Sequence, residues 1–243
     1  LTESEGDFDK AIEWLREKGL AAQTKKAGKV AAEGVSYAVV TEKGVGVIIE
    51  VNSQTDFVAK NDVFKDFVMA LAVVVAEEAP ADVEALKACR YPGTERTVAD
   101  VTADKVLAIG ENIQIRRFVR YAEGVNVPYI HMGGKVGVLV NLAVEGIEPQ
   151  QVTELGKDIA MQICAMNPSY LDKSDVSQEV LDKEKEIQLA LMANDPKMAA
   201  KPDKVKEGIV MGKLGKYYEE NCLLQQAFVK ENKISVEKHV AEI

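Results

Sequence analysis

The order of apolar and polar residues predicts an amphipathic helix at the start of the chain. Its apolar stripe consists of residues three or four positions apart: Phe8, Ala11, Ile12 and Leu15. Asp7 is the expected N-cap and Gly19 the expected end of this helix. Because a single helix of this length is not stable alone, we expect it to be the last helix of a small module, followed by a polar linker at 25–29.

Further along the chain, the spacing of the apolar residues changes from that of a helix to that of extended strands. Two β-branched runs at 37–40 and 45–51 flank a polar turn that contains Gly44, which is typical of a β-hairpin. A polar corner at 52–55 is followed by six apolar residues with the spacing of a buried helix: Phe64, Phe67, Val68, Leu71, Val74 and Val75. Pro80 is the expected end of that helix.

A second copy of this strand-strand-helix unit is predicted in the next part of the chain. The tripeptide Glu-Gly-Val at 33–35 recurs at 123–125, and a strand is expected at 136–142. A helix is expected at 152–166, before Pro168. This repetition indicates an internal duplication.

A further strand between the two copies completes the predicted fold. Ile113, Ile115 and Val119 alternate as the residues of one strand face do. Each copy can then hold a small antiparallel sheet of about three strands with helices on one face. We therefore predict an α+β fold with two related subdomains.

The segment 174–220 predicts a helical hairpin, a candidate coiled coil. Its first helix has apolar residues four and seven positions apart: Val176, Val180, Ile187 and Leu191. Asp175 and Gln178 are the expected capping box, and an Asn-Asp-Pro sequence breaks the helix before a second one returns. The hairpin is an insertion, because the run 223–229 is expected to rejoin the sheet and 235–243 to begin a helix.

The net charge of the chain argues against one class of function, the binding of nucleic acid. The 243 residues include 39 acidic and 30 basic side chains, which gives a formal net charge of -9. A phosphate backbone is repelled by such a chain unless its basic residues gather on one face. The densest basic cluster, Arg116, Arg117 and Arg120, is interpreted as a solvated strand edge. We therefore expect no direct binding of nucleic acid.

Cysteine usage and hydropathy indicate the compartment. Cys89, Cys164 and Cys222 are odd in number and widely spaced, as expected of reduced thiols rather than of a disulfide framework. No apolar run approaches the roughly 18 residues that cross a bilayer. We expect a cytoplasmic protein, or one of an organelle interior, that does not bind a membrane.

The side chains that common enzyme mechanisms require are not grouped along the chain. The two histidines, His131 and His239, stand without a recognisable triad order, and no short spacing of Cys and His predicts a zinc site. The glycine-containing stretches at 133–135 and 208–213 lack the spacing of a phosphate-binding loop. We therefore predict no enzyme, and no metal, cofactor or nucleotide site.

The corner around residue 57 has two interpretations. Spacing alone favours a buried Phe57, because an apolar residue between a polar turn and a helix often acts as a staple. Asp56 would then be a carboxylate at the positive end of the helix dipole. The residues at 50–61 favour another interpretation: they read Glu-Val-Asn-Ser-Gln-Thr-Asp-Phe-Val-Ala-Lys-Asn and closely resemble the signature of the elongation factor Ts family.

This resemblance covers nearly the whole chain and implies a domain organisation. Other segments match the family in the same order: 6–16, 26–34, 109–117, 129–131, 136–140 and 226–229. Four parts are implied: 1–30 as the remnant of an N-terminal UBA-like three-helix module with its linker, 31–121 as the core N-subdomain, 122–173 with 221–243 as the core C-subdomain, and 174–220 as the inserted hairpin. Residues 80–108 are not explained by the resemblance.

The resemblance also implies a function without covalent chemistry. Members of the family bind elongation factor Tu and accelerate the exchange of its GDP for GTP. Phe57 would then be an exposed wedge that enters an apolar gap in the partner and disturbs its magnesium and phosphate site. Six further residues would contact the partner: Thr55, Asp56, Val58, Tyr129, His131 and Val229.

Three alternatives stay open at the level of sequence. His131 could instead pack within the protein or lie on its surface, and core packing is favoured for Phe228. The chain could bind a translation GTPase as a non-catalytic or chaperone-like scaffold. A homodimer, or a complex of two chains with two partner molecules, could form through the hairpin.

Overall fold

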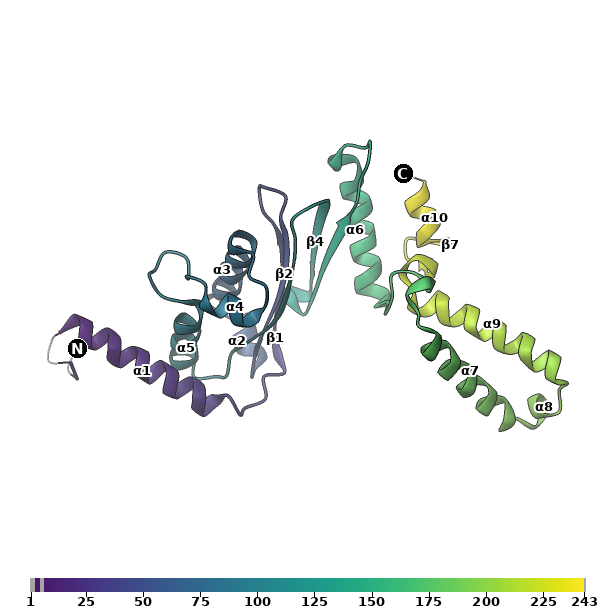
Figure 1. Ribbon diagram of the computed structural model, residues 1–243, viewed down its shortest axis with the longest axis horizontal. Coiled ribbons are helices and arrows are strands. Elements are labelled where there is room, and N and C mark those ends of the chain that lie inside the picture. The colour runs from purple at the N-terminus through teal and green to yellow at the C-terminus, as the bar shows by residue number, and fades with distance from the viewer. Residues whose placement is uncertain (1–2, 5–6, 243) are drawn as a thin grey trace. The chain divides into compact units, whose positions relative to one another are not determined.

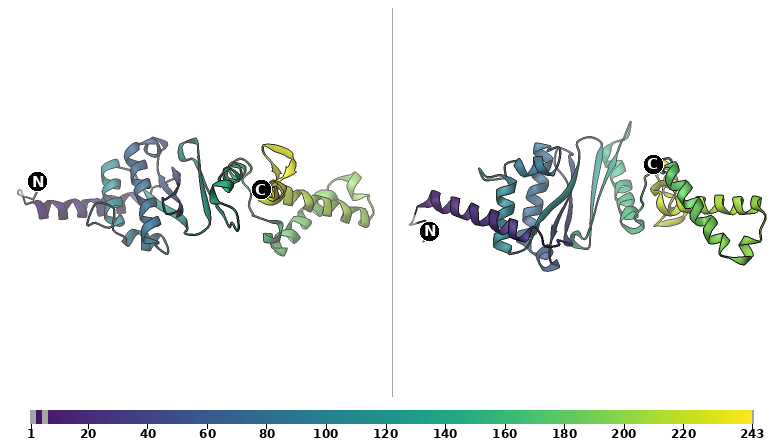
Figure 2. Two further views of the ribbon diagram at one scale, coloured as in Figure 1. Left: turned by 90° about the horizontal axis from the view of Figure 1, so that it is seen from above. Right: turned by 60° about the horizontal axis from the view of Figure 1, so that its bottom comes forward.

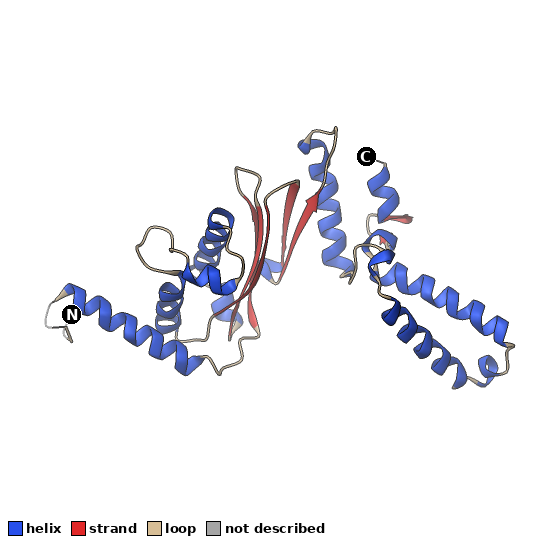
Figure 3. Cartoon of the chain, viewed as in Figure 1, coloured by secondary structure: helices blue, strands red, loops and turns tan. Residues whose placement is uncertain are grey.

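The computed structural model describes residues 3–4 and 7–242. Two predicted features, the matched segment's start at Gly6 and the last helix's end at Ile243, lie outside these residues. The chain separates into two compact units, Leu1–Ala160 and Met161–Ile243. Figure 1 shows the elements along the chain, and Figure 3 distinguishes its helices from its strands.

An antiparallel sheet of three strands forms the centre of the first unit. Its order is β1 (Glu33–Val40), β2 (Gly46–Ser53) and β3 (Gln114–Tyr121). The predicted hairpin is confirmed, since β1 pairs with β2 along its whole length. Gly44 supplies the positive φ of 81° that the turn needs.

A β-bulge decides which side chains of β3 face the helices. Val51 of β2 pairs with Ile115, and the register then shifts so that Arg116 is an extra residue. Ile115 is buried, but beyond the bulge Phe118 packs against the core whereas Val119 is 44% exposed. The prediction that Val119 continues the alternation is wrong, because one extra residue reverses the facing of those that follow.

Helices cover one face of this sheet in Figures 1 and 2. α3 (Asp62–Glu78) is the predicted buried helix, and it ends at Ala79 in left-handed backbone, just before Pro80. α4 (Val83–Ala88) and α5 (Val98–Ile109) lie in the same layer. The core between helices and sheet contains these fully buried side chains: Val47, Ile49, Phe64, Phe67, Leu71, Leu86 and Val98.

A second hairpin, β4 (Val125–His131) and β5 (Val136–Leu142), covers the other face of the sheet. Gly137 allows the close approach, since an added Cβ would lie 2.9 Å from Ser36 Cβ. α6 (Pro149–Met166) then packs on this hairpin, where its own glycine lies directly against a β4 side chain. The α+β class is confirmed, but the second copy pairs two strands rather than about three.

α1 (Phe8–Lys26) is longer than predicted. Asp7 caps its N-terminus as expected, but the helix does not end at Gly19. That glycine is buried and lets α1 approach α5, where an added Cβ would lie 3.2 Å from Asp104 and 3.3 Å from Ala103. Gly19 therefore permits close packing of two helices instead of ending one.

The second unit contains the predicted helical hairpin. α7 (Gln178–Ala193) and α9 (Asp203–Asn221) are joined through the short α8 (Pro196–Ala199). Three apolar side chains of the two long helices are buried: Met192, Val210 and Leu214. A final helix, α10 (Val236–Ala241), follows as predicted.

Two local predictions in this unit are wrong. Ser177, and not Asp175, caps α7, because the Asp175 carboxylate is used in the capping box of the preceding turn. The run 223–229 does not rejoin the sheet of the second copy, which consists of β4 and β5. Its strand β6 (Ala227–Phe228) pairs instead with β7 (Glu231–Ser235) in a separate two-stranded sheet.

Candidate functional site

The signature residues lie at the corner between β2 and the one-turn helix α2 (Asp56–Lys60). Thr55 is the N-cap of α2, and its Oγ1 accepts the N–H of Val58 at 3.4 Å. Ser53 is fully buried, and its hydroxyl donates to the carbonyl of Thr55 at 3.0 Å. A helix this short is not stable by itself, so these bonds and its neighbours hold it in place.

Phe57 projects into solvent from this corner. Its side chain is 83% exposed, whereas Ala59 is buried and Val58 packs partly against the core. The interpretation from spacing, a buried Phe57, is wrong, because one turn of helix turns only one side toward the sheet and Val58 and Ala59 occupy that side. An aromatic ring that is exposed on an anchored backbone is typical of an interface anchor.

An open hollow of about 580 Å³ lies beside Phe57. It is lined by α2, the start of α3 and the end of α5: Thr55, Phe57, Val58, Asn61, Val63, Ala108, Ile109 and Glu111. Val63 is 51% exposed, so the apolar surface continues from Phe57 onto α3. Such a surface suits a protein partner.

Asp56 and Lys60 form a solvent-exposed ion pair on α2. Lys60 Nζ donates a hydrogen bond to Asp56 Oδ2 at 2.6 Å. That bond and the Lys60 charge, with a weaker attraction from Lys135, lower the pKa of Asp56, and the same pair raises the pKa of Lys60. Because both groups are open to solvent, the pair adds little stability, but it keeps a charged carboxylate beside Phe57.

Glu111 is a site residue that the predictions from sequence missed. It follows Gly110, the C-cap of α5, and its carboxylate reaches back to the corner. Oε2 accepts the N–H groups of Gln54 at 3.1 Å and Thr55 at 3.0 Å, and Oε1 accepts the Thr55 hydroxyl at 2.7 Å. Its place in the family-matched segment 109–117 was the sole signal, since no local pattern connects it with Thr55.

Tyr129 and His131 lie at the end of β4. Their rings stack with centroids 6.1 Å apart, and the Tyr129 hydroxyl is 3.3 Å from His131 Nδ1. β4 continues into the turn η1 (Met132–Gly134), which contacts β1. Lys135 follows this turn, and its positive charge helps to lower the pKa of Asp56. The structure thus brings the exposed His131 to the same edge of the first unit as the β2–α2 corner.

Val229 lies in the second unit. Its side chain is exposed, and its N–H donates to Gln162 Oε1 at 2.8 Å. Phe228 is buried and stacks on His239, with ring centroids 4.1 Å apart, which confirms core packing for Phe228. The role of Val229 in partner binding stays a prediction.

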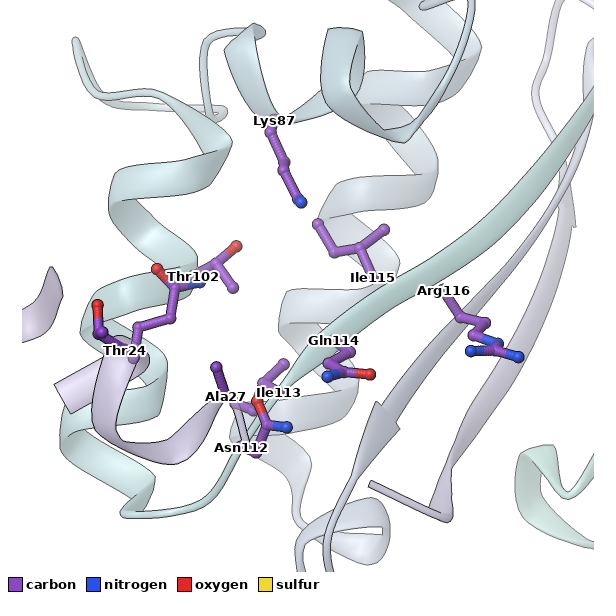
Figure 4. A pocket seen from close by; sticks show the side chains of 10 residues that line it. Thr24, Ala27, Lys87, Thr102, Asn112, Ile113, Gln114, Ile115 and Arg116 are labelled. Atoms are coloured by element: carbon purple, nitrogen blue, oxygen red, sulfur yellow. The ribbon is translucent and has the colours of Figure 1, made fainter. Parts of the chain in front are cut away.

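A second hollow, of about 510 Å³, lies between α1, α4, α5 and β3. Figure 4 shows Lys87 reaching toward it from α4. Lys87 pairs with Glu84 at 2.7 Å and the Thr102 hydroxyl donates to the Val98 carbonyl at 2.7 Å, so these polar groups already have partners on their own helices.

Among the residues that the structure describes, no group of His, Cys, Asp and Glu could hold a metal ion, and no helix is long and apolar enough to cross a membrane.

Comparison with known proteins identifies the family. A family model described as Elongation factor TS matches residues 54–243. The chain is 45% identical over 245 residues to Elongation factor Ts of Syntrophotalea carbinolica, in an alignment that covers 100% of this chain and 79% of that protein. Proteins of the same name from Halothermothrix orenii and Clostridium botulinum are 46% and 43% identical, over 100% of this chain and 80% and 79% of theirs. The chain belongs to the elongation factor Ts family.

Proposed function

We propose that this chain is a guanine nucleotide exchange factor that binds elongation factor Tu and accelerates the release of its GDP by inserting Phe57. Membership of the elongation factor Ts family supports a role in translation elongation. The observation that carries the proposal is the 83% exposure of Phe57 on a corner whose backbone is held by hydrogen bonds to Glu111. An aromatic side chain held in this way is suited to fill a pocket in a partner.

Exchange by such a factor depends on differential binding and needs no covalent chemistry. The factor binds the nucleotide-free partner more tightly than the GDP-bound partner, and by linkage GDP weakens the binding of the factor equally. A coupling of about 4 kcal/mol changes the affinity roughly a thousandfold. Phe57 supplies part of this difference by entering an apolar gap between helices of the partner, which displaces the loops that hold Mg²⁺ and phosphate.

Further contacts extend the proposed interface beyond Phe57. Six residues are proposed to take part: Thr55, Asp56, Val58, Tyr129, His131 and Val229. The first three flank Phe57 on the same corner, and Asp56 offers its charged carboxylate to a polar group of the partner. Tyr129 and His131 contact the partner from the end of β4, and Val229 adds a contact from the second unit.

Substitution of the wedge tests this proposal. We expect Phe57→Ala to slow GDP release at least about tenfold, because an aromatic interface anchor commonly contributes roughly 2 kcal/mol or more. The fold should stay intact, since the ring is exposed. Release of fluorescent GDP from elongation factor Tu measures the effect, and circular dichroism checks folding. Phe8→Ala is the matched control, because Phe8 is a phenylalanine that is 71% exposed on α1, outside the proposed site.

The outcomes separate the two candidate functions. Unchanged GDP release with Phe57→Ala would refute the insertion of this side chain. Stable association of the unsubstituted chain with elongation factor Tu, without faster release of GDP, would favour a non-catalytic scaffold.

A further inference from the structure

We propose that Glu111 is a positioning residue whose carboxylate fixes the β2–α2 corner so that Phe57 is held outward for insertion. This inference rests on the proposed exchange function and deepens it. It assigns no contact with the partner to Glu111 itself. Its basis is the set of hydrogen bonds that Glu111 makes to the backbone and side chain of the corner.

The Glu111 carboxylate matches the donors of the corner. Its two oxygens accept three hydrogen bonds, two from the successive N–H groups of Gln54 and Thr55 and one from the Thr55 hydroxyl. An ionised carboxylate has only acceptor sites, and bonds to it are stronger than those between neutral groups. Glu111 therefore fixes both the direction of the backbone and the side chain of the N-cap.

Thr55 transmits this constraint to the helix that carries Phe57. The Thr55 hydroxyl donates to Glu111 Oε1 at 2.7 Å, while the same oxygen accepts the N–H of Val58 at 3.4 Å. Phe57 lies between the two bonded residues in sequence, and its exposed ring has little packing of its own. The orientation of the ring consequently depends on the backbone of α2 and on the cap at Thr55.

Glu111 is itself held on a rigid segment. Gly110 ends α5 with a φ of 80°, which turns the chain toward the corner. The next residue, Asn112, is buried, and its Nδ2 donates to the carbonyl of Lys29 at 2.8 Å. Ile113 is also buried in the core. Glu111 thus lies between Gly110, which ends α5, and Asn112, which is buried and hydrogen-bonded. Such support holds a positioning group in place.

Hydrogen exchange of backbone amides tests the constraint without the partner. Glu111→Gln keeps the shape of the side chain but removes its charge, so that the N–H groups of Gln54 and Thr55 face a neutral amide instead of a carboxylate. We expect the amides of Gln54 and Thr55 to exchange at least about tenfold faster, because hydrogen bonds to charged groups are the stronger ones. The amide of Ile49 in the centre of β2 should keep its protection.

GDP release tests the link to Phe57. We expect Glu111→Gln to slow the release of GDP from elongation factor Tu about tenfold. The double variant with Phe57→Ala should release GDP less than about twofold more slowly than Phe57→Ala alone, because the effects of residues that act through one another are not additive. Glu42→Gln is the control: it removes the same charge from the exposed turn between β1 and β2, and its release rate should equal that of the unsubstituted chain.

Each contrary outcome has its own meaning. Normal release with Glu111→Gln, together with slow release with Phe57→Ala, overturns the positioning role and leaves the proposed function standing. The same holds if Glu111→Gln slows release by an equal factor in both backgrounds, or if Ile49 also loses protection, since the residue is then a general stabiliser. Normal release with Phe57→Ala overturns the insertion and, with it, the role of Glu111.

Discussion

At the scale of single residues, one carboxylate organises the turn before the helical hairpin. Asp172 Oδ1 accepts the N–H of Ser174 at 2.9 Å, and Oδ2 accepts the side-chain amide of Gln225 at 2.8 Å. These bonds favour the charged form, first through Ser174 and then through Gln225, and lower the pKa of Asp172 to about 2 from 3.8. The bond to Gln225 joins segments 53 residues apart, so this charge stabilises the base of the hairpin.

We expect Asp172→Asn to destabilise the second unit at neutral pH. Because the pKa of Asp172 is lowered in the folded state, its stabilisation is fully present above 3.8 and is lost as the pH falls through about 2. The midpoint of urea unfolding should be higher for the unsubstituted chain at neutral pH, and the difference should shrink across that window. Equal midpoints at neutral pH would contradict the role of this charge.

The exposure of Phe57 shows why single side chains were harder to predict than elements. Spacing favoured burial, and the resemblance alone indicated exposure, because a one-turn helix has too few residues for a periodic pattern. Glu111 could not be found from local sequence, since it reaches Thr55 across 56 positions. Asp56 and its contact with Lys60 follow the ordinary spacing of a helical ion pair.

At the scale of elements, α9 has three interior glycines, Gly208, Gly212 and Gly215. A Cβ added at any of them would meet nothing within 4 Å, so close packing within the chain does not require their small size. Each glycine lowers helix stability by roughly 0.5–1 kcal/mol relative to alanine. α9 is therefore less stable than its length would allow.

We expect Gly212→Ala to raise the free energy of unfolding of the second unit by roughly 0.5–1 kcal/mol. Urea unfolding followed by circular dichroism measures the change. Gly19→Ala in α1 is the matched contrast, because its Cβ would lie 3.2 to 3.4 Å from three atoms of α5 and should give no such gain. A loss of stability with Gly212→Ala would show that this face of α9 is packed.

Periodicity was sufficient to predict many elements, although α4 and α5 were not predicted. Tertiary contacts explain two of the errors. α3 and β5 were found from the spacing of their apolar residues. The end of α1 was placed at Gly19 because a glycine commonly ends a helix, whereas this one is needed for the approach to α5. The bulge at Arg116 depends on pairing with β2, which alternation along one strand does not reveal.

At the scale of the whole chain, each compact unit has buried apolar side chains of its own. The first unit has the larger set, around Phe64, Phe67 and Leu71, and the second unit includes Leu214 and Phe228. The α+β class and the helical hairpin could be predicted from periodicity, but two residues of the apolar stripe predicted for the first hairpin helix, Ile187 and Leu191, are exposed. The subdomain boundaries after residues 121 and 173, which the family resemblance implies, stay predictions.

Separate cores imply that the units can lose structure separately. We expect Leu71→Ala, which opens a cavity in the first unit, to cost about 2–5 kcal/mol and to speed amide exchange throughout the three-stranded sheet. Amides of α7 and α9 should keep their protection in that variant, since subglobal opening is confined to a cooperative unit. Leu214→Ala should have the reverse effect. Hydrogen-exchange mass spectrometry measures both, and equal loss of protection in the two units with either variant would mean that the chain unfolds as one.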